Sequence, residues 1–325
     1  MAEFINPQKL KQRDTAIDFV KFSALFLVLN SHMGICYPKY QFLATGGAIG
    51  DSLFFFASGF TLFLGSREVE RFDEWYKRRI RRIYPSLIAV AILGAIFFGI
   101  DDTFIDVIVA KRYWFVQCIF LLYPFLYVAK RYVTNHLLLL FGLTLVTMAI
   151  FPFIHYGNYL FWGGGYYRWS VYLLFMLLGA IIGEKRESFR QMNVWLSICL
   201  TGAFIIAWYC IIYFFGKSSL HVISIFPMMG VVVSFYCIGT SKPFERLMHS
   251  QIGYVIISIG ALCLESYLIQ KMIITSDWNS LFPWNIPIIM LLVLIASYVT
   301  KLLANLIGQV FDSQPLDWHR ISKLY

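Results

Sequence analysis

Charged residues are scarce in this sequence of 325 residues, where Asp, Glu, Lys and Arg together make up 14%. A soluble domain carries roughly 25% charged residues, so this chain lacks the polar surface that a water-soluble globule needs. Segments of about ten residues with alternating apolar and polar side chains are also absent, which argues against an outer-membrane barrel. Hydrophobic residues make up 59%, and the sequence therefore predicts an all-α membrane protein.

Several motifs of soluble catalysis are missing as well. The sequence has no GxxxxGKS/T phosphate-binding loop, no GxSxG nucleophile elbow and no HExxH zinc motif, which argues against ATP-driven pumping and serine-hydrolase chemistry. Its six cysteines show no CxxC or Cys/His spacing typical of zinc sites. We therefore expect no metal, and we interpret the cysteines as small apolar residues of a helix bundle.

Long apolar runs make up most of the chain. They are about 20 residues long, which matches a hydrocarbon core of about 30 Å at about 1.5 Å per helical residue. We predict a polytopic bundle of about ten transmembrane helices that forms one domain over residues 1–325, and the first ten residues lack the apolar core of a cleavable signal peptide. The predicted spans are 17–37, 45–65, 83–100, 113–129, 137–154, 169–183, 194–215, 222–239, 251–274 and 283–308.

Positive charge is concentrated on one side of the predicted bundle. If the N-terminus is cytoplasmic, 19 of the 27 Lys and Arg residues fall in cytoplasmic segments and five in outer segments. Cytoplasmic loops of membrane proteins carry such an excess, so we predict that both termini are cytoplasmic and that the chain is a multi-pass protein of the inner (cytoplasmic) membrane. The net charge of +9 follows from this topology, and we expect no nucleic-acid partner.

The first predicted span contains polar residues that are unusual for a membrane helix. Asp18, Lys21 and His32 lie in the run IDFVKFSALFLVLNSHM, and a charge within a span is costly enough to be a functional candidate. Lys21 and His32 are eleven residues apart, so both project from one helix face, about 16 Å apart along the axis. Two structural interpretations remain open: Lys21 can be a snorkelling anchor paired with Asp18, and His32 can be a buried histidine hydrogen-bonded to a neighbouring helix.

The second span and the segment after it carry two further features. The Ser58-Gly59 pair lies in the apolar stretch DSLFFFASGFTLFLGS, where it can serve close helix packing. Five cations follow, namely Lys77, Arg78, Arg79, Arg81 and Arg82. This basic cluster can be an anchor at the lipid headgroups. It is denser than orientation requires, however, and five cations at a membrane mouth also suit a polyphosphate ligand that enters from the cytosol.

Four stretches of the sequence occur in an order that one known family shares. IDFVKFSALFLVLNSH has ten residues between a basic residue and a histidine, and LFFFASGFTL is a phenylalanine-rich Ser-Gly segment. WYKRRIRRIYP is similar to a basic loop that runs into Tyr-Pro, LESYLIQ precedes the last span, and YWFVQCIFLLYPF is a fifth match. In these stretches the chain resembles the integral-membrane acyltransferase-3 family, which includes bacterial O-antigen and exopolysaccharide O-acetyltransferases.

Two positions depart from the pattern of that family. The basic residue of the first helix is usually an arginine, and here it is Lys21, which keeps the charge but loses the planar fork that binds phosphate. The late-helix motif often ends in a histidine, and here it ends in Gln270. This leaves His32 as the leading candidate for the catalytic base.

The resemblance implies transfer of an acyl group, usually acetyl, from cytosolic acyl-CoA to a carbohydrate hydroxyl. His32 would act as a general base on the hydroxyl or would carry the acyl group itself. Acetyl-CoA would be the donor, and its headgroup would be bound by Lys21, Ser58, Arg78, Arg79, Arg81 and Arg82. The residues expected to support this site are Asp18, Glu265, Tyr267 and Gln270.

The acceptor would approach from the outer face, where the segment 155–169 is rich in aromatic residues and glycine. Tyr156, Trp162 and Tyr166 could stack on sugar rings, and Arg168 could meet a phosphate. An aromatic belt at the membrane interface explains the same residues. The expected partners are acyl-CoA, a carbohydrate acceptor that is free or lipid-linked, and membrane lipids; a homo-oligomer is also compatible.

Two other functions remain open from the sequence. Ten helices with buried charge and an aromatic outer vestibule would suit a sugar or lipid transporter, although no repeat relates the two halves of the chain. A non-catalytic subunit of a polysaccharide assembly system would use His32 for packing alone. Activity that depends on acyl-CoA and is lost in His32→Ala separates the acyltransferase from both.

Overall fold

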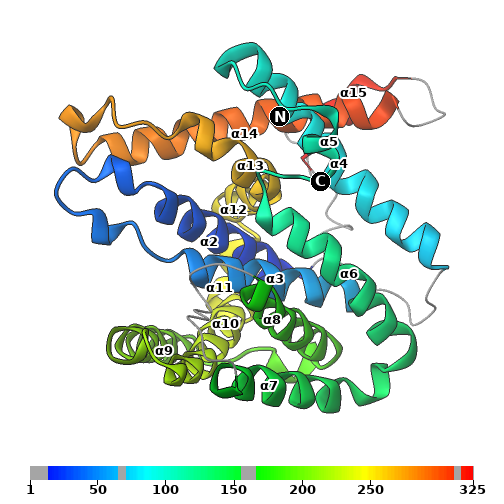
Figure 1. Cartoon of the computed structure of the whole chain (residues 1–325), viewed down its shortest axis with the longest axis vertical. Helices are drawn as coiled ribbons and strands as arrows, with labels where there is room; N and C mark the ends of the chain where they lie inside the picture. Colours follow the sequence, from blue (N-terminus) through cyan, green and yellow to red (C-terminus); the bar gives the residue numbers. More distant parts are fainter. Residues whose placement is uncertain (1–13, 65–70, 155–165, 311–315, 325) are drawn as a thin grey trace. The chain divides into compact units, whose positions relative to one another are not determined.

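The structure is a computed structural model that describes residues 14–64, 71–154, 166–310 and 316–324, and within these ranges every regular element is a helix (Figure 1). The prediction of an all-α protein is therefore confirmed for the described residues. The α-helices are α2 (Thr15–His32), α3 (Gly47–Phe63), α4 (Phe72–Phe98), α5 (Phe104–Ile108), α6 (Trp114–Tyr132), α7 (Leu137–Ile154), α8 (Tyr166–Glu184), α9 (Val194–Phe215), α10 (Ile225–Gly239), α11 (Lys242–Met248), α12 (Gln251–Ala261), α13 (Cys263–Ile273), α14 (Asn285–Val310) and α15 (Trp318–Ile321).

Each predicted span overlaps one of these helices, and the span 251–274 overlaps the pair α12 and α13. Among the described residues, seven helices are long and apolar enough to cross a membrane, or eight if α12 and α13 together form one bent span. The count leaves out α2, whose 18 residues include Asp18 and Lys21 and end in Asn-Ser-His. It also leaves out α6, which ends in Lys-Arg-Tyr. The total of ten spans and the orientation stay predictions.

The start of α4 differs from the sequence-based expectation. The basic cluster was expected in a loop before the span, but it lies inside α4, which begins at Phe72. Asp73 and Glu74 occupy the first turn, where negative charge stabilises the helix dipole. Lys and Arg are good helix formers, so the helix runs through the cluster before it becomes apolar. It ends at Gly99, whose φ of 61° is the left-handed conformation that glycine adopts most readily.

The described chain divides into two compact units. Unit 1 comprises Met1–Ala24, Asp51–Leu64 and Leu137–Gly260, and unit 2 comprises Leu25–Gly50, Gly65–His136 and Ala261–Tyr325. In unit 1, α9 packs against α10 and α7 packs against α8. In unit 2, α14 packs against both α4 and α13.

Helices α3 and α8 of unit 1 approach each other closely through two glycines. A Cβ atom on Gly59 would lie 1.9 Å from the Met176 carbonyl oxygen, and one on Gly179 would lie 2.1 Å from the Phe56 carbonyl oxygen. Only a residue without a side chain fits such backbone contacts, and small residues have this role at helix interfaces in membranes. The structural interpretation of Gly59 is thereby supported.

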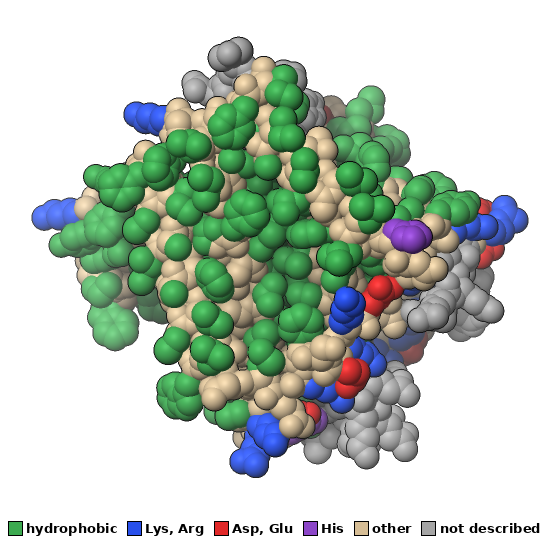
Figure 2. Space-filling model, turned by 90° about the horizontal axis from the view of Figure 1, so that it is seen from below, with side chains coloured by type: hydrophobic (Ala, Val, Ile, Leu, Met, Phe, Trp, Pro, Cys, Tyr) green, Lys and Arg blue, Asp and Glu red, His purple; other side chains and the backbone are tan. Residues whose placement is uncertain are grey.

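Unit 1 also exposes large apolar side chains on α7 and α9. Trp195 and Tyr213 of α9 are 74% and 84% exposed, and Leu138 and Leu143 of α7 are 67% and 59% exposed. Figure 2 shows a face on which hydrophobic side chains predominate, while most Lys and Arg side chains lie at its margins. Broad apolar surfaces of this kind are rare on soluble monomers, so these helices are suited to contact lipid.

Candidate active site

His32 is the last residue of α2, and the structure confirms that α2 is one helix from Thr15 to His32. Lys21 therefore lies on the same helix, eleven residues or about 16 Å of helical rise before His32. Asn30 fixes the end of the helix, because its side-chain nitrogen donates to the Leu43 and Thr45 carbonyl oxygens at 2.7 and 3.0 Å. The Tyr37 hydroxyl donates to the Asn30 side-chain oxygen at 2.7 Å.

The segment that follows His32 is held by side chains from the end of the chain. The Asn285 amide donates to the Cys36 carbonyl oxygen at 2.8 Å, and the Asn279 amide donates to the Ile35 carbonyl oxygen at 2.9 Å. Asn285 is fully buried, so this hydrogen bond forms away from solvent and fixes the backbone firmly. These two asparagines therefore hold the backbone directly after His32. No motif in the sequence indicated this role.

The His32 ring lies beside Gln270 of α13. The Gln270 side chain is within hydrogen-bonding reach of the ring, and the charge of Lys271 acts on it. Gln270 is 1% exposed, and its amide nitrogen donates to the Tyr267 carbonyl oxygen at 3.2 Å. The buried Nδ1 of His32 makes no well-aligned hydrogen bond within the described residues. The ring thus keeps capacity to hold or accept a proton.

A buried carboxylate lies earlier on the same helix. Glu265 is 0% exposed, and one of its oxygens accepts hydrogen bonds from the Ser86 hydroxyl at 2.7 Å and from the Lys301 ammonium at 3.1 Å. Its second oxygen has no hydrogen-bond partner among the described residues. Glu265 therefore connects α13 to α4 through a hydrogen bond and to α14 through an ion pair. Tyr267, two residues further, accepts a hydrogen bond from the Phe115 backbone at 3.4 Å.

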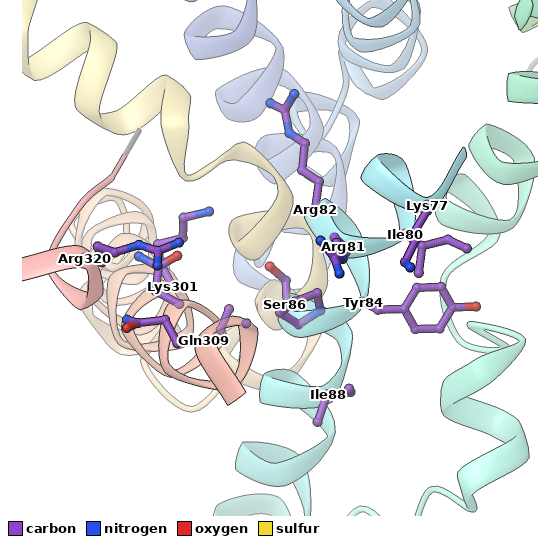
Figure 3. A pocket seen from close by; sticks show the side chains of 14 residues that line it. Lys77, Ile80, Arg81, Arg82, Tyr84, Ser86, Ile88, Lys301, Gln309 and Arg320 are labelled. Carbon is purple, nitrogen blue, oxygen red and sulfur yellow. The ribbon is translucent and has the colours of Figure 1, made fainter. Parts of the chain in front are cut away.

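A cationic cavity opens between α4 and the C-terminal helices α14 and α15. It has a volume of about 660 Å³, and 14 residues line it. Figure 3 shows Lys301, Gln309 and Arg320 on one side, opposite the side chains that α4 contributes. The lining includes five cations, namely Lys77, Arg81, Arg82, Lys301 and Arg320, whereas no Asp or Glu of the described chain lines it.

The basic cluster thus divides between two environments. Arg81 and Arg82 line the cavity, but Arg78 and Arg79 are not among its lining residues. The Arg79 guanidinium lies over the Trp75 ring, 4.8 Å from its centroid, which is a cation–π contact. The donor-binding role expected for all four arginines stays a prediction, and the cavity adds Lys301 and Arg320, which that expectation did not contain.

Three residues expected to bind the donor or to support its site, Asp18, Lys21 and Ser58, belong to unit 1. Asp18 is 2% exposed and Lys21 is half-buried, both on the first turns of α2. Ser58 is half-buried on α3, and its carbonyl oxygen accepts a hydrogen bond from the Thr61 hydroxyl at 3.1 Å. These residues lie on the predicted helices, and their proposed contact with a donor stays a prediction.

The expected acceptor residues are only partly described. Tyr156 and Trp162 lie outside the described residues, and so does the side chain of Tyr166, the first residue of α8. Arg168 is described, and its charge acts on the carboxylate of Asp51, which is 8% exposed on α3.

The Asp51 carboxylate has a second contact in unit 1. It accepts a hydrogen bond from the Tyr172 hydroxyl at 3.2 Å. Sequence reasoning missed this carboxylate, although an aspartate followed by an apolar run was visible in DSLFFF. A buried charge requires a partner, so Arg168 has a structural reason to be where it is.

Comparison with known protein families gives a match over most of the chain. A family model described as an acyltransferase domain matches residues 14–304, which is most of the chain. The chain has no significant match to a curated protein or to a solved structure. Within the described residues, no group of three or more His, Cys, Asp or Glu side chains could hold a metal ion.

Proposed function

The chain belongs to the acyltransferase-3 family, and we propose from this that it is a membrane O-acyltransferase whose donor is cytosolic acetyl-CoA. The acceptor is a hydroxyl of a cell-surface or lipid-linked carbohydrate at the outer side of the membrane. The observation that carries the proposal is the family match over residues 14–304, which includes His32 and the helix α13 beside it. Family membership supports acyl transfer in general, and the identity of donor and acceptor is our inference.

His32 has the chemistry that the reaction needs. The acceptor hydroxyl oxygen forms a bond to the thioester carbonyl carbon while His32 takes the hydroxyl proton. The carbon–sulfur bond then breaks, the proton passes to the leaving sulfur, and the products are an O-acyl ester and a free thiol. If His32 carries the acyl group instead, its ring nitrogen makes the first attack and the hydroxyl makes the second.

The surroundings of the ring favour either role. Gln270 is neutral and buried, so it can orient the ring without competing for the proton, as the third group of a catalytic set does. Asn30, Asn279 and Asn285 fix the end of α2 and the segment after it. A catalytic side chain must be held within a narrow range of positions, and this network supplies that restraint.

The donor would reach His32 from the cytoplasmic side of the predicted topology. Lys21, Ser58 and the basic cluster Arg78, Arg79, Arg81 and Arg82 would bind its phosphates. The acceptor would approach from the opposite side, where Arg168 and the aromatic residues of 155–169 are expected. The chain would then lie in the inner membrane as a multi-pass protein.

The proposal is tested by acetyl-CoA binding and by slow thioester hydrolysis with the purified protein in detergent. Wild type should bind and turn over, whereas His32→Ala should bind but lose about 10²- to 10⁴-fold in turnover, the range for a general acid–base residue. Lys21→Ala should bind weakly. His249→Ala is the matched control, because His249 is exposed in a turn after α11.

Two outcomes would contradict the proposal. If wild type shows no affinity for acyl-CoA, the proposed donor is wrong, and transport of a sugar or lipid becomes the favoured function. If wild type turns over and His32→Ala turns over equally, His32 serves packing alone.

A further inference from the structure

We propose that the cavity between α4, α14 and α15 binds the phosphate groups of the acyl donor, and that Lys301 and Arg320 are phosphate ligands from the C-terminal end of the chain. This inference rests on the proposed function and deepens it. It assigns a site to residues that neither the family pattern nor the sequence motifs singled out.

The charge of the cavity selects an anionic ligand with several phosphates. Its five cations come from three helices, and no carboxylate of the described chain lines it. No ion pair within the described residues joins Lys77, Arg81 or Arg82 to a carboxylate. Cations that lie close together repel one another, so a ligand that brings negative charge among Lys77, Arg81 and Arg82 would stabilise the arrangement.

Lys301 is held at the cavity by a buried anchor. Its ammonium donates to Glu265 at 3.1 Å, and its side chain is 22% exposed while that of Glu265 is 1% exposed. The Ser86 hydroxyl holds the same carboxylate oxygen at 2.7 Å. A lysine on a flexible stem loses much rotamer entropy when it binds a ligand. Glu265 has already fixed the Lys301 side chain, so we assign Glu265 as a positioning residue for Lys301.

The size of the cavity fits the nucleotide end of the donor. A volume of about 660 Å³ lies in the middle of the range of about 300–1,000 Å³ that small-molecule sites occupy. Apolar side chains such as Ile80, Ile88 and Pro85 line it together with the cations, so a base and a sugar can pack while the phosphates meet the charges. A nucleotide that carries both a diphosphate and a ribose phosphate has this combination.

Arg320 distinguishes this site from the general family pattern. It lies on α15, and Gln309 lies near the end of α14, so both are beyond the residues 14–304 that the family model matches. The Gln309 amide donates to the Asp317 carbonyl oxygen at 3.2 Å, and its side-chain oxygen accepts from the Asp317 backbone at 2.8 Å. These two bonds hold α15 against α14. The segment after the last predicted span is thus part of the donor site.

The test is equilibrium binding of acetyl-CoA to the full-length protein in neutral detergent. Lys301→Gln and Arg320→Gln should each raise Kd about tenfold or more, because each removes a charge-assisted hydrogen bond of about 1.5–3 kcal/mol. Lys323→Gln is the matched control and should bind within about twofold of wild type, since Lys323 follows α15 but does not line the cavity. Acetyl-pantetheine, which lacks the nucleotide, should bind all four proteins equally.

Further ligands distinguish whether the cavity binds the phosphates of CoA or those of a lipid headgroup. Dephospho-CoA, which lacks the ribose phosphate, should bind wild type more weakly than CoA does. The ratio of the two Kd values should be smaller in the variant that lacks the cation bound to that phosphate. If Lys301→Gln and Arg320→Gln weaken binding of phosphatidylglycerol but leave acetyl-CoA unchanged, the cavity holds a lipid headgroup and the inference is overturned.

Failure of the inference differs from failure of the proposed function. If wild type binds and hydrolyses acetyl-CoA but both variants bind it as wild type does, the inference alone is wrong. If wild type neither binds nor hydrolyses acetyl-CoA, both are wrong. Because Lys301→Gln disturbs a buried pair, Arg320→Gln decides the question if the former does not fold, since Arg320 is exposed.

Discussion

Replacing Gly59 with alanine should force α3 and α8 apart. The new Cβ would lie 1.9 Å from the Met176 carbonyl oxygen and 2.6 Å from its carbonyl carbon, and both atoms belong to the backbone, which cannot rotate away. Overpacking of this kind costs about 1–3 kcal/mol, and the better helix propensity of alanine returns at most about 1 kcal/mol. Because the clash is with backbone atoms, the cost should lie at the upper end of that range, and we expect a net loss of about 2 kcal/mol in the free energy of unfolding.

The assay is thermal unfolding in detergent, with Gly142→Ala as the control. Gly142 lies in α7 and a Cβ on it would meet nothing within 4 Å, so this variant should be as stable as wild type or slightly more stable. A lower Tm in Gly59→Ala alone confirms that Gly59 serves packing. Equal Tm values in the two variants would refute the steric argument, and equal Tm with lost acetyl-CoA binding would show that the Ser58-Gly59 segment binds the donor directly.

Two buried carboxylates, Glu265 and Asp51, give further predictions. Lys301→Met should lower the free energy of unfolding by about 3 kcal/mol, because it leaves the Glu265 carboxylate buried without its cation. The double variant Glu265→Gln/Lys301→Met should recover much of the lost Tm. A Lys301→Met variant as stable as wild type would contradict this prediction. Arg168→Gln should likewise lower Tm, because it removes the positive charge that acts on the buried Asp51 carboxylate, and Asp51→Asn/Arg168→Gln should restore it. A higher KM for the acceptor with unchanged Tm in Arg168→Gln would instead favour the acceptor role expected from the sequence.

The helices were the most predictable part of the structure. Apolar runs of the right length mark them because a bilayer leaves few other options to a polypeptide backbone, and every predicted span overlaps a helix. The start of α4 was not predictable from hydropathy, since the cluster around Arg81 is strongly polar. Helix propensity and the acidic first turn at Asp73 and Glu74 were the signals that could have placed it.

The site was predictable only where its residues are close in sequence or share a motif. His32, Gln270 and Glu265 were named from the sequence, and the structure places Gln270 beside His32. The partner of Glu265 was not predictable, because Lys301 is 36 residues away on another helix. Which charges meet across helices depends on helix packing, and packing leaves no periodic signal in a single sequence. Asp51 was missed for the same reason.

Helix α13 gives unit 2 a physical connection between the two ends of the proposed reaction. Glu265 and Gln270 are five residues apart on it, which corresponds to about 7.5 Å of helical rise. Glu265 holds Lys301 at the cationic cavity, and Gln270 lies beside the His32 ring. If the donor binds Lys301 as proposed, it would act on α13, the helix that carries Gln270 beside the proposed catalytic base His32. Glu265 and the five residues after it are all buried on α13, so a change at Glu265 is close to the packing that holds Gln270. We therefore predict that Glu265→Gln alters kcat as well as donor affinity.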